Sequence, residues 1–237
     1  APGLQSVGFS CQRNPAETFT APEAAMICAP RGFTPMTHRF HRAVRERLLR
    51  DPYAGKRPPV LVNNWEATYF DFDEEKLLNI AKVAAPLGIK LLVMDDGWFG
   101  ERNDDFGGLG DWTVNRRKLP GGLEELVPQV QKLGMQFGLW VEPEMVSENS
   151  ALYRAHPEWT LGAPGRPAAR GRSQLALDLS REDVRDYLFG ALKNVLDSTE
   201  IAYVKWDMNR SFTDIWSAAL PPERQWETPR RYNQGLT

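Results

Sequence analysis

The sequence predicts an α/β protein: part of a (β/α)8 TIM barrel with about five strands, preceded by remnants of an all-β sandwich domain. Two observations predict the barrel: continuous apolar strands alternate with amphipathic helices after residue 59, and no glycine-rich phosphate-binding motif follows the first strand. Short strand-like segments separated by Pro and Gly predict the sandwich remnants. We therefore divide the chain into residues 1–58, the end of an N-terminal β-sandwich domain with a helical linker, and residues 59–237, the N-terminal part of the barrel.

The first of these parts has a pattern of its own. Three segments, 7–9, 18–20 and 25–28, have the residue types of short strands. A basic segment from Pro35 to Leu49 carries apolar residues at helical spacing, which predicts a helix. The stretch 51–59 is rich in Pro and Lys and is expected to be a linker.

In the second part, strands and helices alternate along the chain. Uninterrupted apolar runs predict buried strands at 59–63, 89–94, 136–141, 175–179 and 201–206. Three amphipathic segments predict helices: one begins after Asp73, one covers 121–134, and one runs from a capping-box sequence at Ser180–Asp183 to Ser198. This alternation predicts a parallel sheet with helices packed against it.

Composition and charge exclude several classes of protein. Of the 237 residues, 42% are hydrophobic and 25% are charged, which is typical of a globular domain and excludes intrinsic disorder. The net charge of −2 gives no electrostatic basis for binding nucleic acid or a membrane surface, and no apolar run approaches a membrane span. No signal peptide is visible, and Cys11 and Cys28 are expected to be buried thiols, so we expect a cytoplasmic protein.

Each of the five predicted strands ends in polar side chains. The residues at these ends are Asn63, Asn64, Trp65, Glu66, Asp95, Asp96, Trp98, Glu142, Glu144, Asp178, Lys205, Asp207 and Asn209. In (β/α) barrels the active site lies at the carboxyl ends of the strands, so these residues are the candidates for catalysis and binding. Trp beside carboxylates favours a carbohydrate site, because a flat apolar ring stacks on a sugar face.

The residue types at the strand ends favour glycoside chemistry without a metal. The three histidines lie away from the strand ends in no zinc-binding pattern, and no Gly-x-Ser-x-Gly nucleophile motif is present. Several carboxylates with Trp, Lys and Asn match glycoside chemistry, in which one carboxylate attacks or activates water and another protonates the leaving oxygen. The residues leave open one alternative, a magnesium-dependent enolase-type barrel with Asp95 and Glu144 as ligands.

Six motifs, each at a strand end or in the loop that follows it, resemble those of the glycoside hydrolase family 36 α-galactosidases. They are Asn64–Ala67, Met94–Gly100, Gly110–Trp112, Gly138–Met145, His156–Trp159 and Lys205–Arg210. Any one of these motifs alone is weak, whereas six in the same order are a strong signal. The resemblance extends into the first part of the chain, where Pro22–Ala24 and His38–His41 match the end of the family's β-sandwich and its helical connection.

This resemblance implies roles for individual residues. Asp207 matches the catalytic nucleophile, and the adjacent Lys205 would keep its carboxylate ionised and contact the sugar hydroxyls. Asp95 and Asp96 match the pair that binds the galactose 4- and 6-hydroxyls. The other substrate-binding residues that the resemblance implies are the aromatic walls Trp65 and Trp112, together with Arg172 and Asn209.

The activity implied by the resemblance is that of a retaining α-galactosidase. Such an enzyme hydrolyses terminal α-galactosyl residues of melibiose- or raffinose-type oligosaccharides through a covalent galactosyl-Asp207 intermediate. Two alternatives stay open: a raffinose-synthase-like galactosyltransferase, and a non-catalytic galactose-binding remnant. We expect no cofactor and no metal. The expected partners are α-galactoside sugars, with homo-oligomers because full-length family members are often tetrameric.

The sequence is expected to be a fragment of such an enzyme. No stretch after Asp207 matches the Ser-, Cys- and Gly-rich sequence that carries the family's acid/base aspartate. Without that second carboxylate, we expect no steady turnover by this chain alone. The open edges of a partial parallel sheet also predict poor solubility or pairing with a second copy.

Overall fold

The structure is a computed structural model that describes residues 15–21, 23–49 and 55–236. The chain forms two compact units, Ala1–Pro59 and Val60–Thr237, and each is described by itself. No helix within the described ranges is long and apolar enough to cross a membrane.

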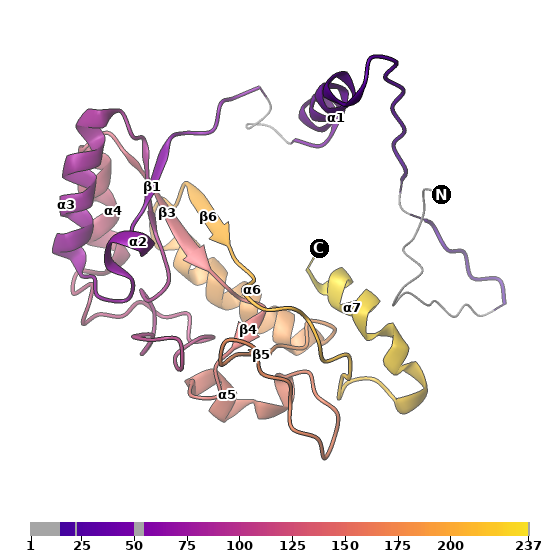
Figure 1. Cartoon of the computed structure of the whole chain (residues 1–237). Helices are drawn as coiled ribbons and strands as arrows, with labels where there is room; N and C mark the ends of the chain where they lie inside the picture. The colour runs from indigo at the N-terminus through magenta and orange to yellow at the C-terminus, as the bar shows by residue number, and fades with distance from the viewer. Residues whose placement is uncertain (1–14, 22, 50–54, 237) are drawn as a thin grey trace. The chain divides into compact units, whose positions relative to one another are not determined.

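Within its described residues, the first unit contains one helix, α1, over Phe33–Arg47 (Figure 1). This helix confirms the predicted one to within two residues at each end. The predicted strands at 18–20 and 25–28 are not formed, because an extended segment becomes a strand only where a neighbouring strand satisfies its backbone groups. Cys28, expected to be buried, is exposed. The segment 7–9 and Cys11 lie outside the described residues.

The second unit is built on a parallel sheet of four strands (Figure 1). The strands are β1 (Leu61–Asn63), β2 (Leu91–Met94), β3 (Gln136–Val141) and β6 (Tyr203–Trp206), in the order β1-β2-β3-β6. The register places Asn63, Val93, Gly138 and Tyr203 in one row across the sheet. All four carboxyl ends therefore meet at one edge, and the partial α/β barrel predicted from the sequence is confirmed.

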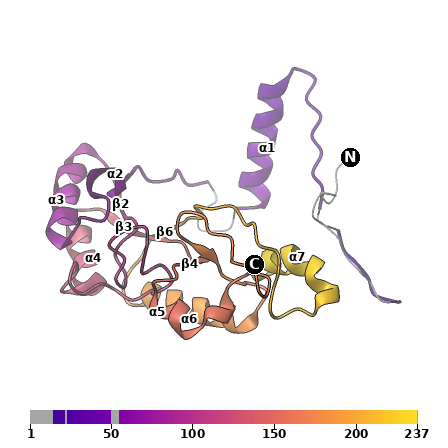
Figure 2. The same ribbon diagram turned by 60° about the horizontal axis from the view of Figure 1, so that its bottom comes forward.

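Helices connect these strands and cover the sheet. The connecting helices are α2 (Trp65–Thr68), α3 (Glu74–Ala84) with the 3₁₀ turn η1 (Ala85–Leu87), α4 (Gly122–Lys132), α5 (Ala151–Ala155), η2 (Pro157–Trp159) and α6 (Glu182–Asp197). After β6 the chain forms η3 (Pro222–Glu227) and α7 (Thr228–Gly235). Helices α3 and α4 lie side by side in both ribbon views (Figures 1 and 2).

The helix predictions are confirmed, with one difference in capping. Asp73 caps α3, since its carboxylate accepts a hydrogen bond of 2.8 Å from the Lys76 backbone N–H. The predicted capping box before α6 is not formed. Its Ser180 hydroxyl donates instead to Asp178 at 2.5 Å, and Arg181 is the residue before the helix. A nearby buried acceptor therefore outcompetes the helix end for this hydroxyl.

The predicted barrel strand at 175–179 is wrong. The strand formed there, β5, covers only Leu175–Ala176, and it pairs antiparallel with β4, Met145–Val146, outside the parallel sheet. The apolar residues of this segment are buried as expected. Burial explains the apolar run, but a sequence pattern does not say which strand supplies the hydrogen bonds.

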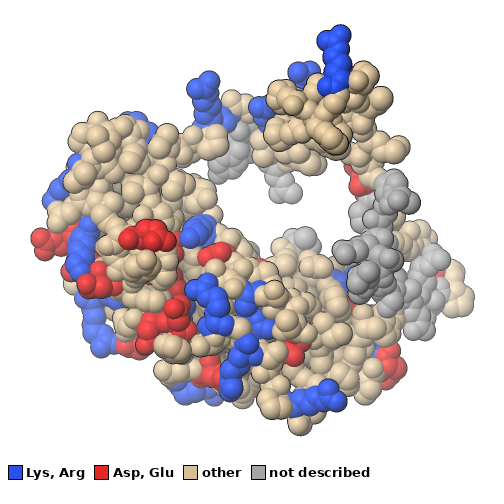
Figure 3. All heavy atoms as spheres, in the orientation of Figure 1, with Lys and Arg blue, Asp and Glu red and all other residues tan. Residues whose placement is uncertain are grey.

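The core lies between the sheet and the apolar faces of α3 and α4. All four residues of β2 are buried, and so is the stripe of α4 made by Leu123, Leu126, Val127 and Val130. The outer strand β6 differs, because three of its four residues are exposed. On the surface shown in Figure 3, basic and acidic side chains of this unit are interspersed rather than gathered by sign.

Candidate active site

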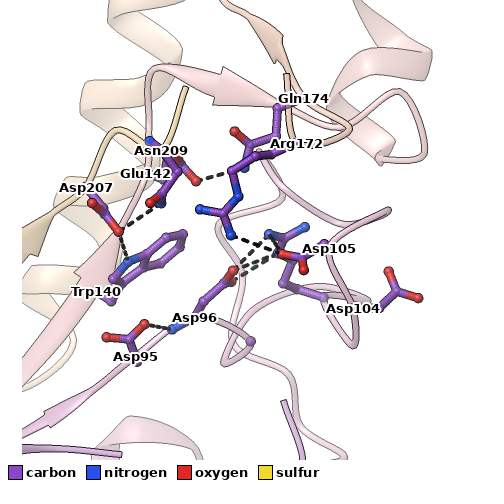
Figure 4. A network of polar contacts seen from close by, with 12 residues as sticks. Asp95, Asp96, Asp104, Asp105, Trp140, Glu142, Arg172, Gln174, Asp207 and Asn209 are labelled. Atoms are coloured by element: carbon purple, nitrogen blue, oxygen red, sulfur yellow. Dashed lines mark hydrogen bonds and ion pairs between the residues drawn. The ribbon is translucent and has the colours of Figure 1, made fainter. Parts of the chain in front are cut away.

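The carboxyl ends of β2, β3 and β6 bring four acidic residues to one edge of the sheet. Asp95 and Asp96 follow β2, Glu142 follows β3, and Asp207 follows β6. In Figure 4 these four side chains lie near one another at this edge. Parallel pairing is the reason for this gathering, because every strand of the sheet ends on the same side.

Asp95 is 2% exposed and is held on both carboxylate oxygens. Its Oδ2 accepts hydrogen bonds from the Lys205 ammonium at 2.8 Å and from the Asn63 amide. Its Oδ1 accepts from the backbone N–H of Asp96 at 3.0 Å. Lys205 therefore pairs with Asp95, and this ion pair links the end of β6 to the end of β2.

Asp96, 6% exposed, faces the buried guanidinium of Arg102. Arg102 Nε lies 3.0 Å from Asp96 Oδ1, and Nη2 lies 2.8 Å from Oδ2, which makes a two-pronged ion pair. Burial raises the pKa of Asp96, while Arg102 acts in the opposite direction. The sharp turn after Asp96 requires Gly97, whose φ is +105° and where a Cβ would meet the Phe70 ring at 3.0 Å.

Lys118 anchors the loop that carries Asp96 and Arg102. The Lys118 ammonium donates to the carbonyl oxygens of Phe70 and Gly97 at 2.9 Å each, and to that of Arg102 at 3.3 Å. Burial lowers the pKa of this amine, with Asp96 and Asp71 opposing the shift. Neither Arg102 nor Lys118 follows a strand, so the search of strand ends missed both.

Asp207 is half-buried and is oriented by two hydrogen bonds to the same oxygen. Its Oδ2 accepts from the Trp140 indole at 3.0 Å and from the Asn209 amide at 2.8 Å (Figure 4). Burial raises the pKa of Asp207, but these hydrogen bonds and the positive charge of Lys205 outweigh it and lower the pKa below its ordinary value. Asp207 is therefore ionised, oriented and still accessible.

Glu142 and Glu144 are buried, and all four of their carboxylate oxygens have partners. Glu142 accepts from the Asn209 backbone N–H at 2.6 Å and from the Gln174 amide at 3.0 Å. Burial raises its pKa, with the donors opposing. Glu144 accepts from the Trp206 indole at 3.0 Å and from the Tyr232 hydroxyl at 2.7 Å. These two carboxylates support neighbouring side chains instead of facing the open space.

The two Trp residues predicted as aromatic walls, Trp65 and Trp112, differ in exposure. Trp65 is partly exposed at the start of α2, with its ring edge-on to Tyr69 and Phe70. Trp112 is 2% exposed and lies against Trp98, Phe99 and Trp140. The Trp112 ring faces its aromatic neighbours, so in this structure it supports the Trp140 indole that holds Asp207.

Arg172 reaches the site from a tight turn between β4 and α6. Gly171 and Gln174 form a bridge around the two central residues Arg172 and Ser173. The Arg172 guanidinium extends toward the loop after β2, where its Nη2 lies 3.6 Å from Asp105 (Figure 4). Asp105 was not a candidate from the sequence, because an acidic residue in an exposed loop has no local signature of function.

The arrangement brings the eight sequence-predicted site residues to one edge of the sheet or to the loops beside it, and three of them, Asp95, Asp96 and Trp112, are buried. Among the described residues, no group of three or more His, Cys, Asp or Glu side chains is placed to hold a metal ion. The site instead offers one accessible ionised carboxylate, one Lys–Asp ion pair and fixed acceptor oxygens. Such a set suits attack on a polar, uncharged substrate that carries several hydroxyl groups.

Comparison with known proteins places this chain among carbohydrate-active proteins. A family model described as Melibiase matches residues 18–237. The α-galactosidase AgaA of Geobacillus stearothermophilus is 57% identical over 234 residues, which cover 99% of this chain and 32% of that protein. α-Galactosidase 1 of Pediococcus pentosaceus is 47% identical over 234 residues, again 99% of this chain and 32% of that protein.

Solved structures give the same result. The crystal structure of the GH36 α-galactosidase AgaA superposes with a TM-score of 0.83 and 62% identity, over 85% of this chain and 28% of that chain. A variant of AgaA in complex with raffinose superposes equally well. The present chain spans about a third of the length of the curated relatives it matches.

Proposed function

Since this chain belongs to the melibiase family, whose GH36 α-galactosidases it matches, we propose that it carries the nucleophile side of the active site of a retaining α-galactosidase. The proposed reaction is hydrolysis of terminal α-galactosyl residues of raffinose- and melibiose-type oligosaccharides. The names of the relatives, all α-galactosidases, support hydrolysis over galactosyl transfer to a sugar.

The observation that carries this proposal is the setting of Asp207. A nucleophilic carboxylate must be ionised, fixed in direction and open to the sugar. The hydrogen bonds from Trp140 and Asn209 to Oδ2 and the lowered pKa meet the first two requirements. The remaining oxygen, Oδ1, accepts only from the backbone N–H of Met208 at 3.1 Å among the contacts of the described residues. Oδ1 is therefore the atom that we propose attacks the anomeric carbon.

The binding side of the proposed pocket is formed by the residues after β2 together with Lys205 of β6. Asp95, Asp96 and Lys205 present fixed acceptors and one ammonium group, which suits recognition of vicinal sugar hydroxyls. Arg172 and Asn209 lie on the opposite side, and the partly exposed ring of Trp65 offers an apolar surface. A variant of AgaA has been crystallised with raffinose, which supports this class of substrate.

The proposed mechanism needs a second carboxyl group as acid and base, at about 5–5.5 Å from the nucleophile. Glu142 and Glu144 do not suit this role, because both oxygens of each accept hydrogen bonds from buried neighbours. We propose that a segment outside these 237 residues supplies the acid/base. Steady hydrolysis of natural α-galactosides by the 237-residue chain is accordingly expected to be absent.

The test is a single-turnover experiment with an aryl α-galactoside whose leaving group needs little protonation. The wild-type chain is expected to release up to one equivalent of phenol in a burst, while Asp207→Asn releases none. Intact-mass spectrometry of the quenched wild-type reaction should detect one galactosyl group on Asp207. The matched control is Asp186→Asn, which removes the same charge from the exposed face of α6 and should keep the burst.

A burst that persists in Asp207→Asn would contradict the assignment of the nucleophile. A folded wild-type chain that binds galactosides without a burst would favour a galactose-binding role instead. Robust turnover of raffinose by the wild-type chain would mean that one of its own carboxylates is the acid/base.

We also propose that copies of the chain associate through the β6 side of the sheet. β6 is the last strand in the sheet order, and its residues Tyr203, Val204 and Trp206 are exposed. An uncovered edge strand with apolar side chains favours pairing. The compartment that we propose is the cytoplasm, which rests on the sequence expectation alone.

A further inference from the structure

A row of alternating charges joins the loop after β2 to the turn that carries Arg172. It runs from Asp96 to Arg102, then to Asp105, and ends at Arg172 (Figure 4). Asp105 Oδ1 lies 3.8 Å from Arg102 Nη2 and 3.6 Å from Arg172 Nη2. One oxygen of Asp105 therefore lies near two arginines, one from its own loop and one from the turn at residues 171–174.

Arg102 is the rigid part of this row. It is 1% exposed, and besides its two-pronged contact with Asp96 it donates to the Gly107 carbonyl oxygen at 3.0 Å. Its guanidinium also lies 5.5 Å from the centre of the Phe70 ring. These contacts hold the Arg102 guanidinium in one position. Arg102 therefore offers Asp105 a positive charge at a fixed place.

Arg172 is held in a backbone conformation that its residue type disfavours. Arg172 and Ser173 both have positive φ, 51° and 60°, in a two-residue turn that commonly uses Asn or Gly. Arg210 clamps the segment around the turn, since its Nη1 donates to the carbonyl oxygens of Ala169 at 2.7 Å and Gln174 at 2.8 Å. Strained positions of this kind persist where the surroundings enforce them, and they gather at functional sites.

The turn fixes where the Arg172 backbone lies, but it does not fix the long side chain. The side chains of Arg172 and Asp105 are 46% and 47% exposed, so solvent and a ligand can reach both. In this open setting the direction of the guanidinium depends on the charge that it faces. Asp105 supplies that charge, and Arg102 supplies the fixed partner of Asp105.

We propose that Asp105 is a positioning residue that couples Arg172 to Asp96, so that the two groups face the galactosyl unit as one preformed pair. The inference rests on the proposed function, which assigns Asp96 and Arg172 to sugar binding. The expected benefit is affinity, because a guanidinium that is already oriented loses less freedom when the ligand binds. Loss of the Asp105 charge should therefore weaken binding without removing any group that touches the sugar.

The first test uses the ligand-free chain and reads the Arg172 side chain directly. In ¹⁵N-edited NMR spectra, the Arg172 Nε–H resonance is assigned by its loss in Arg172→Gln. Asp105→Asn should shift and broaden this resonance, and Asp105→Glu should restore much of its position. The matched control is Asp104→Asn, which removes the same charge one residue earlier and keeps an acceptor for the Phe106 N–H. An Arg172 resonance unchanged in Asp105→Asn would overturn the proposal.

The second test is a double-mutant cycle on the affinity for the iminosugar 1-deoxygalactonojirimycin, measured by calorimetry. A variant of AgaA has been crystallised in complex with this compound. Asp105→Asn is expected to weaken binding by about threefold to tenfold, and Arg172→Gln by more. The double variant should bind about as weakly as Arg172→Gln alone, because Asp105 acts through Arg172. Effects that multiply in the double variant would show that Asp105 acts independently and would overturn the proposal.

The two tests separate failure of this inference from failure of the proposed function. If the wild-type chain does not bind the iminosugar, the proposed function is contradicted for this chain, and the NMR arm still decides whether Asp105 orients Arg172. If the wild-type chain binds the iminosugar but the double-mutant cycle shows no coupling between Asp105 and Arg172, the proposed function is supported and the positioning role of Asp105 is contradicted.

Discussion

Asp96 after β2 and Asp207 after β6 lie at the same edge of one sheet, but their surroundings differ. β2 is an inner strand with neighbours on both sides, and Asp96 is buried against a buried arginine. β6 is the outer strand, and Asp207 is half-buried and held by neutral donors, Trp140 and Asn209. Burial raises the pKa of Asp96, whereas hydrogen bonds lower that of Asp207.

The difference teaches that one sheet edge can supply two kinds of carboxylate. A buried, ion-paired carboxylate is a fixed acceptor with little freedom to react. A half-exposed carboxylate with neutral donors keeps its charge and one free direction of approach. The packing of the parent strand decides which kind arises, because an inner strand is covered on both edges and an outer strand is not.

The largest expected effect is on stability, from Arg102→Met. This change leaves the Asp96 carboxylate buried without its partner, which should lower the free energy of unfolding by about 3–5 kcal/mol. Asp207→Asn should change it by no more than about 1 kcal/mol, because Asp207 is half-buried and its donors are neutral. Urea denaturation of both variants checks this contrast.

The control for that experiment is Arg117→Met, which breaks an exposed ion pair with Glu101. An exposed pair contributes about 0–1 kcal/mol, so this variant should unfold almost as the wild type does. If Arg102→Met and Asp207→Asn lowered the free energy of unfolding equally, the proposed difference between the Asp96 and Asp207 carboxylates would be contradicted.

Lys205→Met tests the ion pair that joins the two strand ends. Removing the ammonium leaves Asp95 buried with only the Asn63 amide and one backbone donor, at an expected cost of about 1–3 kcal/mol. Affinity for 1-deoxygalactonojirimycin should fall at least about tenfold if Lys205 also contacts the sugar. Lys193→Met, which breaks the exposed pair with Asp197, is the control and should alter neither quantity.

Asn209→Ala tests the low pKa of Asp207. Loss of the 2.8 Å hydrogen bond should raise that pKa toward the ordinary 3.8. A ¹³C NMR titration of the aspartate carboxyl groups measures the shift. The pKa of Asp207 is lower in the folded state than in the unfolded chain, so the ionised carboxylate stabilises the fold above pH 3.8. That stabilisation is lost as the pH falls through the pKa that Asp207 has in the folded state. Asn209→Ala should therefore lose less stability on acidification, and an unmoved pKa would mean that Asn209 does not hold the charge.

The smallest expected effect on stability comes from Phe189→Ser, on the exposed face of α6 near β6. Phe189 is 71% exposed and lines an apolar groove with Leu188, Leu192 and Trp206. Stability should change by no more than about 0.5 kcal/mol, while self-association in analytical ultracentrifugation should weaken. Leu87→Ser, equally exposed beside α3, is the control and should leave association unchanged. If Leu87→Ser weakened self-association and Phe189→Ser did not, the interface would lie on the β1 side of the sheet instead.

Much of the fold could be predicted from local pattern. Apolar runs located β1, β2, β3 and β6, and amphipathic spacing located α3, α4 and α6. These predictions work because burial on both faces and burial on one face leave different periods in the sequence. The error at Leu175–Ala176 has the same origin, since a buried run in an antiparallel pair gives the same pattern as one in a parallel sheet.

The candidate site likewise contains residues that could be identified from the sequence and residues that could not. Asp95 and Asp207 follow strands, and Lys205 lies near the end of β6, so all three could be found from the strand ends. Arg102 and Asp105 could not, because they lie in an irregular loop and their importance comes from partners distant in the fold. Trp112 was expected as an aromatic wall of the sugar pocket, and only the tertiary structure shows that its ring lies against Trp98, Phe99 and Trp140.

The sequence by itself determined the parallel strands, the helices between them and the acidic residues that meet at one edge. It determined them because hydrophobic periodicity is a local property of the chain, and because strands that alternate with helices favour parallel pairing. Only the tertiary structure decided which acidic residue is buried with a cation and which stays half-open beside neutral donors. That choice depends on long-range contacts, Arg102 with Asp96 and Trp140 with Asp207, whose geometry no local pattern encodes.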